Sequence, residues 1–260
     1  MLKKIYLLPV FVVSIFIASC QKESLDELTK DQASSARFTN SNQTTTANRT
    51  VYYWANLMVQ NVLPQNNTYN TSVNLVTWAG QNGATAYQCT TVCSGFLTKI
   101  LTQTYGYTSN YFQTWTGSSS PHAATYYNEI ITHDHFTQIS QVSQILQNDI
   151  IALQYPAGSS STGHIMIVAS PPVLRTASAP LVTGTTQYEI SILDCSSTGH
   201  GSTDTRYISS GVFHSGAGRG VFRLYVNSSG SIVGYAWSTY SNSTYYSQSQ
   251  RQLAIGRLVP

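Results

Sequence analysis

Apolar residues recur along this chain with two different periods. In the first half of the folded region they fall at helical spacing in three stretches, which predicts helices over residues 51–63, about 91–105 and 120–131. Thr90 or Thr91 can cap the second helix, and Gly106 ends it. Pro121 suits the first turn of the third helix, where its missing N–H costs nothing.

After Gln147 the period changes from 3.6 to 2, which indicates strands. We expect them over residues 149–155, 163–170, 187–195, 220–227, 231–237 and 252–258. Asn227 to Gly230 is a hairpin turn between two of them. Because helices come first and antiparallel strands follow, the pattern predicts one α+β domain over residues 51–260, with helices packed on a mostly antiparallel sheet.

The first 50 residues have the pattern of a targeting segment followed by a flexible tether. Lys3 and Lys4 precede an apolar run too short to span a membrane, so residues 1–19 are expected to be a signal peptide. Small residues before Cys20 resemble the lipobox of bacterial lipoproteins, which implies cleavage before Cys20 and its lipidation. The alternative is an ordinary secretory signal. Residues 20–50 would then be the lipidated cysteine and a flexible polar tether, and Gln21 favours a periplasmic or surface-facing address on the outer membrane.

Composition excludes one class of partner. Charged residues make up 9% of the chain, and without the two lysines of the expected signal the basic and acidic side chains nearly balance. No basic stripe exists to neutralise phosphates, so nucleic acid is not an expected partner. We expect a monomer that needs no cofactor or metal and contacts the membrane through its lipid.

Cysteine number constrains the chemistry. With Cys20 assigned to lipid, Cys89, Cys93 and Cys195 are left, an odd number for an oxidising compartment. If Cys89 pairs with Cys195, then Cys93 is the free thiol. If Cys93 is bridged instead, it cannot be a nucleophile.

Three residues suggest a thiol hydrolase. Cys93 begins an apolar helix, His164 opens an apolar strand, and Asp194 ends the next strand, so the chain holds a nucleophile, a base and a group that orients the base. Lowering a thiol pKa by about two units takes roughly 2.7 kcal/mol, whereas a helix end supplies about half to one, so an imidazolium partner is needed. Ser94 is small, and backbone amides beside it could bind an oxyanion.

The motifs around these residues resemble a known family. Cys93-Ser-Gly-Phe, Gln147-Asn-Asp-Ile-Ile-Ala and Gly163-His-Ile-Met-Ile-Val are similar to motifs of the NlpC superfamily of papain-like cysteine peptidases, to which the CHAP amidases are related. The resemblance implies a papain-like fold and cleavage of amide bonds in peptidoglycan stem peptides or cross-links. It implies roles as nucleophile, base and orienting residue for Cys93, His164 and Asp194.

The resemblance extends downstream, with departures. The pattern from Asp194 to Arg257 resembles an uncharacterised bacterial branch of that group, which implies places near the cleft for His200, Asp204 and Arg206. Tyr87 or Gln88 would help the oxyanion site. Family members usually carry an aspartate just before the cysteine, where this chain has Val92, and the interval from cysteine to histidine is long here. Both departures bear on substrate more than on chemistry.

Three other functions fit parts of the sequence. An acyltransferase of the transglutaminase kind would use the same residue order. A zinc peptidase could draw ligands from His133, His135, His200 and Asp204, although their order is reversed relative to known zinc wall endopeptidases. A non-catalytic surface binding module would suit a polar, tyrosine-rich surface.

Overall fold

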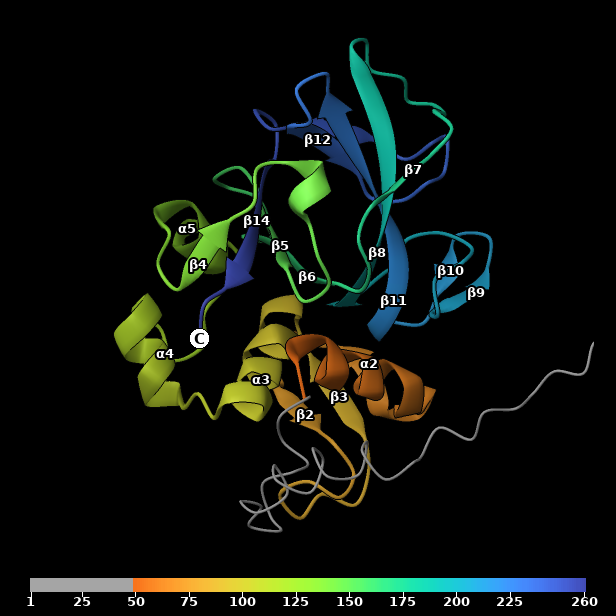
Figure 1. Cartoon of the computed structure of the whole chain (residues 1–260). Coiled ribbons are helices and arrows are strands. Elements are labelled where there is room, and N and C mark those ends of the chain that lie inside the picture. The colour runs from red at the N-terminus through yellow and green to blue at the C-terminus, as the bar shows by residue number, and fades with distance from the viewer. Residues whose placement is uncertain (1–48) are drawn as a thin grey trace, which may run out of the picture. The chain divides into compact units, whose positions relative to one another are not determined.

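The structure, a computed structural model, describes residues 49–260 (Figure 1). The expected signal peptide, Cys20 and nearly all of the expected tether lie outside the described residues. The helices are α2 (Val51–Asn61), α3 (Cys93–Tyr105), α4 (Ser109–Thr116) and α5 (Ala123–Thr132). Within residues 49–260, no helix is both long and apolar enough to cross a bilayer.

Local sequence explains most helix ends. Thr50 caps α2 by accepting a hydrogen bond from the Tyr53 amide, and Gly106 ends α3 in the left-handed conformation, as expected. The predicted cap of α3 was wrong, because its N-cap is Val92 and no side chain caps it. Helix α5 begins at Ala123, two residues after the predicted proline start. Helix α4 was not predicted because it buries only Phe112.

The main sheet has the strand order β13-β12-β11-β8-β6-β5-β14-β4, with β7 paired to β8. Every pairing in it is antiparallel. The six expected strands are present as β5 (Ile150–Gln154), β6 (Gly163–Val168), β8 (Thr185–Ser196), β11 (Gly216–Asn227), β12 (Ile232–Ala236) and β14 (Gln252–Leu258). Three short strands join them: β4 (Phe136–Gln138), β7 (Val173–Leu174) and β13 (Tyr245–Ser247).

Two small sheets were not predicted. Strands β1 (Asn67–Tyr69), β2 (Leu75–Thr77) and β3 (Gln88–Thr91) form a three-stranded sheet in which β1 and β3 run parallel. Strands β9 (Tyr207–Ser209) and β10 (Val212–Phe213) form a hairpin. The expected order of helices before strands therefore needs correction, since β1 to β3 precede α3. Runs of two to four residues are too short to show a period.

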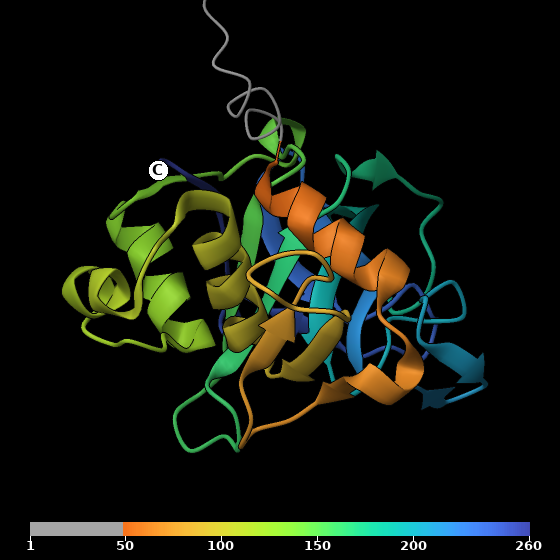
Figure 2. The ribbon, with the colours of Figure 1, turned by 90° about the horizontal axis from the view of Figure 1, so that it is seen from below.

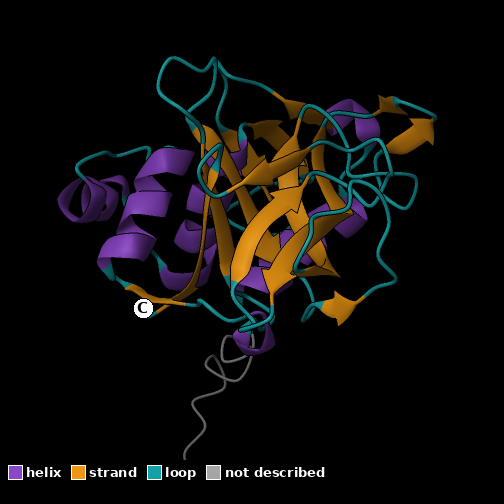
Figure 3. Ribbon diagram, turned by 90° about the horizontal axis from the view of Figure 1, so that it is seen from above, coloured by secondary structure: helices purple, strands orange, loops and turns teal. Residues whose placement is uncertain are grey.

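The main sheet separates two hydrophobic clusters. Along β6, Ile165 and Ile167 pack with the helices, whereas Met166 and Val168 join the cluster on the opposite face. Successive strand residues point to opposite faces, which explains the split. Helices α2, α3 and α5 cover the first face (Figure 2), and Figure 3 shows the strands forming the centre of the domain. The fold is α+β with a mostly antiparallel sheet, as the sequence predicted.

Candidate active site

Pairing between β6 and β8 positions His164 and Asp194. Ile167 pairs with Leu193 and Val168 with Ile192, so the same register sets Asp194 diagonally across from His164 on one face of the sheet. The Nε2 atom of His164 lies 2.7 Å from Oδ2 of Asp194, and both residues are buried. Gly163 makes this strand start possible, because it has φ of 152° and a Cβ there would lie 1.8 Å from the Leu153 carbonyl oxygen.

Cys93 is the first residue of α3 and meets the histidine from the helical side. Strand β3 ends at Thr91, and the helix starts after Val92, whose carbonyl accepts from the Phe96 amide at 2.9 Å. The side chain of Cys93 is buried, with 5% of the residue exposed. The charge of Cys93 acts on His164, and the imidazole is the donor toward the sulfur. Asp194 engages Nε2 of His164, which leaves Nδ1 as the other ring nitrogen.

These contacts set the protonation of His164. Burial alone would lower the pKa of its imidazole, but the negative charge at Cys93 and hydrogen bonds to Asp194 and Cys93 raise that pKa to about 9. At neutral pH the histidine is therefore an imidazolium beside the sulfur. A cation in that place stabilises a thiolate, which is the nucleophilic form of cysteine.

A buried network holds the aspartate from behind. Nε2 of His200 lies 3.0 Å from Oδ2 of Asp194, and an Arg206 guanidinium nitrogen lies 2.8 Å from Oδ1. Arg206 also forms a two-pronged pair with Asp204, whose carboxylate accepts from the His200 amide at 2.9 Å. Burial favours the neutral acid, but the charges of Arg206 and His200 hold the pKa of Asp194 well below its usual range.

Polar and aromatic contacts fix the ring of His200. Its Nδ1 lies 2.7 Å from the Trp237 carbonyl oxygen and its Nε2 faces Asp194, so both nitrogens face acceptors. Its ring also stacks on the indole of Trp237 at 4.2 Å between centroids. Arg206 is the cation that pairs with both Asp194 and Asp204. Such pairing is what lets charges persist in a protein interior.

Of the residues expected near the cleft, His200, Asp204 and Arg206 do converge on the site. All three are buried behind Asp194, so they position the carboxylate and do not line the cavity. Ser94 is buried in the first turn of α3, and its carbonyl accepts from Thr98. Tyr87 directly precedes β3 and Gln88 begins it, and neither lines the cavity beside His164.

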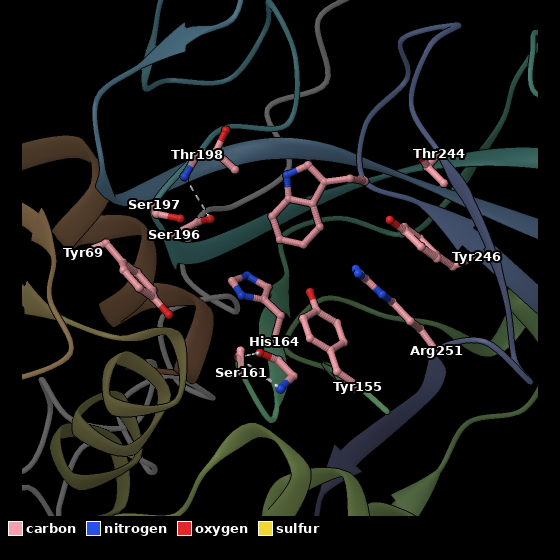
Figure 4. Close-up of a pocket in the computed structure, with 12 residues that line it drawn as sticks. Tyr69, Tyr155, Ser161, His164, Ser196, Ser197, Thr198, Thr244, Tyr246 and Arg251 are labelled. Atoms are coloured by element: carbon pink, nitrogen blue, oxygen red, sulfur yellow. Dashed lines mark hydrogen bonds between the residues drawn. The ribbon is translucent and has the colours of Figure 1, made fainter. Parts of the chain in front are cut away.

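A cavity of about 340 Å³ opens beside His164 (Figure 4). Its wall is rich in aromatic and hydroxyl side chains: Tyr69, Tyr155, Ser161, Gly163, His164, Ser196, Ser197, Thr198, Trp237, Thr244, Tyr246 and Arg251. Burial and the nearby charge of Cys93 raise the pKa of Tyr69 to about 12, so its phenol is a hydrogen-bond donor close to the sulfur. Sequence reasoning missed Tyr69, because β1 is too short to be recognised and lies 24 residues before the cysteine.

The cysteines of the described region all carry free thiols. Cys195 lies on β8 next to Asp194, and its sulfur is 3.3 Å from the Thr91 carbonyl oxygen. Burial, followed by a hydrogen bond and charge from Cys89, raises the pKa of Cys195 well above its usual value. Cys89 and Cys195 are therefore neighbours, but they are not bridged, so the conditional pairing of these two cysteines is absent and Cys93 is free without it.

One group in residues 49–260 has donor atoms spaced for a metal. It consists of His164, Asp194 and His200, whose ligand atoms lie within 4.8 Å of one another. Arg206 pairs with the same carboxylate, and its fixed positive charge opposes a cation there. The zinc set considered from sequence does not assemble, since His133 and His135 lie on the turn after α5 and neither belongs to this group.

Comparisons with known proteins identify a relative but no activity. No family model matches the chain, and no solved structure matches it. The "Uncharacterized protein R653" of Acanthamoeba polyphaga mimivirus is 31% identical over 215 residues, which cover 79% of this chain and 94% of the viral protein. The chain belongs to the same protein family as this viral protein.

Proposed function

We propose that this protein is a cysteine hydrolase that cleaves amide bonds through Cys93, with a papain-like arrangement of helix and sheet. The observation that carries the proposal is the effect of Cys93 on His164, with Asp194 at 2.7 Å from Nε2 of the imidazole and a cavity beside the histidine. A thiol at a helix start, a base on a buried strand and an acceptor for its second nitrogen meet the requirements for a thiol nucleophile.

The mechanism follows from the order of contacts. The Cys93 thiolate attacks the amide carbonyl, and the new oxyanion is stabilised by amides at the start of α3 and by the Tyr69 phenol. The His164 imidazolium then protonates the departing amine, leaving a thioester on Cys93. Neutral His164 takes a proton from water, which attacks the thioester and releases the acid. Asp194 keeps the imidazole oriented in each step.

As substrate we propose peptides of the bacterial cell wall, stem peptides or cross-links. The support is the sequence resemblance to peptidoglycan peptidases and a cavity walled by hydroxyl and aromatic groups, which suit a polar peptide. We also propose that Cys20 is lipidated and holds the domain at the outer membrane. Metabolic labelling with palmitate should mark the wild-type protein and not Cys20→Ala.

The experiment that tests the proposal compares variants on one substrate. The chain without its signal segment, as wild type, Cys93→Ala and Cys89→Ala, is incubated with purified peptidoglycan, and released fragments are analysed by mass. We expect fragments with new amine and carboxyl ends from wild type and Cys89→Ala, and none from Cys93→Ala. The Cys89→Ala variant is the matched control because it removes a buried thiol that does not act on His164.

Other outcomes are equally informative. Equal release by wild type and Cys93→Ala would refute a cysteine mechanism. Transfer of the acyl group to an added amine such as hydroxylamine or glycinamide, in place of hydrolysis, would identify the acyltransferase. Binding to the polymer with no fragment from any variant would identify a non-catalytic binding module.

A further inference from the structure

One side chain in the cavity wall stands apart from its neighbours. Arg251 is the only cavity residue with a permanent charge; the other lining side chains are tyrosine, tryptophan, serine, threonine and the histidine itself. Arg251 is half-buried, and removing part of an unpaired charge from water is costly, so this guanidinium calls for a partner.

The protein gives Arg251 aromatic support. The guanidinium carbon lies 4.3 Å from the centroid of the Tyr155 ring and 4.0 Å from that of Tyr246. Contacts to two aromatic rings favour the cation. Hydrogen bonds from Arg251 also act on the phenols of Tyr155 and Tyr235, which are neutral partners and leave its charge uncompensated. Figure 4 shows Arg251 reaching from the wall toward Tyr155, on the same cavity as His164.

No acidic side chain of residues 49–260 neutralises this arginine. The ion pairs of the described region involve Arg175, Arg206 and Arg257, and none involves Arg251. An arginine held between two rings with its donors unmatched by a carboxylate is prepared to receive one from outside.

Hydrogen bonds order the turn that carries Arg251. Its amide donates to the Ser247 carbonyl at 3.0 Å, in the turn between β13 and β14. Gln248 braces that turn by bonding both main-chain groups of Leu253 and the Ile232 carbonyl. A main chain that is already ordered loses little conformational entropy on binding, which favours recognition.

We propose that Arg251 is the specificity-determining residue of this cavity and binds a carboxylate that the substrate carries near the amide attacked by Cys93. The proposal rests on the proposed function for the identity of the attacked bond. It names the substrate class: acidic peptides, with the carboxylate received by the planar fork of Arg251 between Tyr155 and Tyr246. Arg251 and His164 line the same cavity of about 340 Å³, and the charge of Cys93 acts on both His164 and Tyr155 of that wall.

The test uses alkylating probes of graded length. Iodoacetyl derivatives of glycine, β-alanine and γ-aminobutyrate, each as the free acid and as the primary amide, react with Cys93 by forming a sulfur–carbon bond and expelling iodide. Intact-mass kinetics with peptide mapping gives the rate at Cys93 for each probe. The measured quantity is the ratio of acid to amide rates at each length.

In the wild type we expect the acid to react faster than its amide at the length that spans sulfur and arginine, by roughly tenfold for a charge-assisted hydrogen-bonded pair. Arg251→Gln should abolish that preference, and Arg251→Lys should keep part of it as a point charge. Arg49→Gln is the matched control, because Arg49 also lies over an aromatic ring, that of Trp54, outside this cavity. Unchanged rates with iodoacetamide show that the variants keep the thiol intact.

No acid preference at any length in the wild type, or the same preference in Arg251→Gln, would overturn the proposal. An unreactive Cys93 would move the test to equilibrium binding: the unreactive acetyl analogues of the same acids and amides are titrated into Cys93→Ala, and the Arg251 Nε–H signal is followed by NMR. A shift with acids alone supports the subsite, and no shift refutes it. The outcomes separate cleanly, because acid preference without hydrolysis refutes only the proposed function, whereas hydrolysis without acid preference refutes only the subsite.

Discussion

Oδ2 of Asp194 lies 2.7 Å from Nε2 of His164 and 3.0 Å from Nε2 of His200, so one carboxylate oxygen is shared by two imidazoles. The other oxygen is paired with Arg206. The carboxylate has an imidazole or a guanidinium beside each oxygen, which restrains the orientation of the His164 ring. His200 and Arg206 thereby influence how His164 faces Cys93, although they contact Asp194 and not the cysteine.

The first prediction concerns alkaline pH. The pKa of His164 is raised to about 9, so the imidazolium that accompanies the thiolate is present below that pH and is lost as pH rises through it. We expect kcat/KM for amide cleavage to fall above about pH 9. In Asp194→Asn the hydrogen-bonded anion is gone, so this alkaline limb should move down by about one unit.

A matched variant checks that the alkaline fall in kcat/KM depends on the protonation of His164. Asp134→Asn removes a carboxylate that lies 2.7 Å from the exposed His135, outside the site, and should leave the pH profile unchanged. An alkaline limb that stays in place in Asp194→Asn would contradict the assigned role of Asp194.

The second prediction concerns the buried charges. Arg206→Met removes the cation that faces both Asp194 and Asp204, leaving two buried carboxylates with His200 alone. We expect a loss of about 3–5 kcal/mol in the free energy of unfolding, measured in urea. Because the folded-state pKa of Asp194 is depressed, its contribution is present above its unfolded pKa and disappears as pH falls through the folded value.

The dependence of stability on acidic pH distinguishes a loss of charge pairing in Arg206→Met from a loss of packing. If the network stabilises through charge, wild type and Arg206→Met should converge in stability as pH falls and the carboxylates gain protons. A constant difference at all pH values would indicate that the guanidinium acts through volume alone.

The third prediction concerns thiol selectivity. Cys93 sits beside an imidazolium, whereas Cys195 is fully buried with its pKa raised well above the usual value. Brief treatment of the native protein with iodoacetamide should therefore modify Cys93 and spare Cys195, as read by peptide mass mapping. Modification of Cys195 first, or a bridge that includes Cys93, would rule out Cys93 as the nucleophile.

The fourth prediction concerns the ion pair between Arg257 and Asp149, which we expect to serve stability and not catalysis. Nε of Arg257 lies 2.9 Å from Oδ1 of Asp149, which ties β14 to the residue before β5 and raises the pKa of Arg257. Neither residue lines the cavity beside His164. Arg257→Ala should lower stability by about 1 kcal/mol, discounted because the arginine is partly exposed, and leave kcat/KM unchanged. A fall in kcat/KM without a fall in stability would place this pair in the catalytic machinery.

Some of the site was readable from residue order alone. Cys93 at a helix start, His164 at the start of an apolar strand and Asp194 near the end of the next are all local signals, and helix and strand periodicity brought them out. The register of β6 and β8 then adds only the diagonal contact between His164 and Asp194. The motif around Asp149 and Arg257 was also visible, but its role as an ion pair between two strands was not.

Local pattern alone determined the long elements of this protein, the α+β class and the candidate nucleophile, base and acceptor, because each depends on residues close together in the chain. Only the tertiary structure decided that His200 and Arg206 lie behind Asp194, that Tyr69 stands near Cys93, and that Arg251 enters the cavity between two tyrosine rings. Those contacts join segments that have no periodic relation to one another. They exist because strand pairing brings distant segments together around the same histidine, and local sequence periodicity carries no information about such contacts.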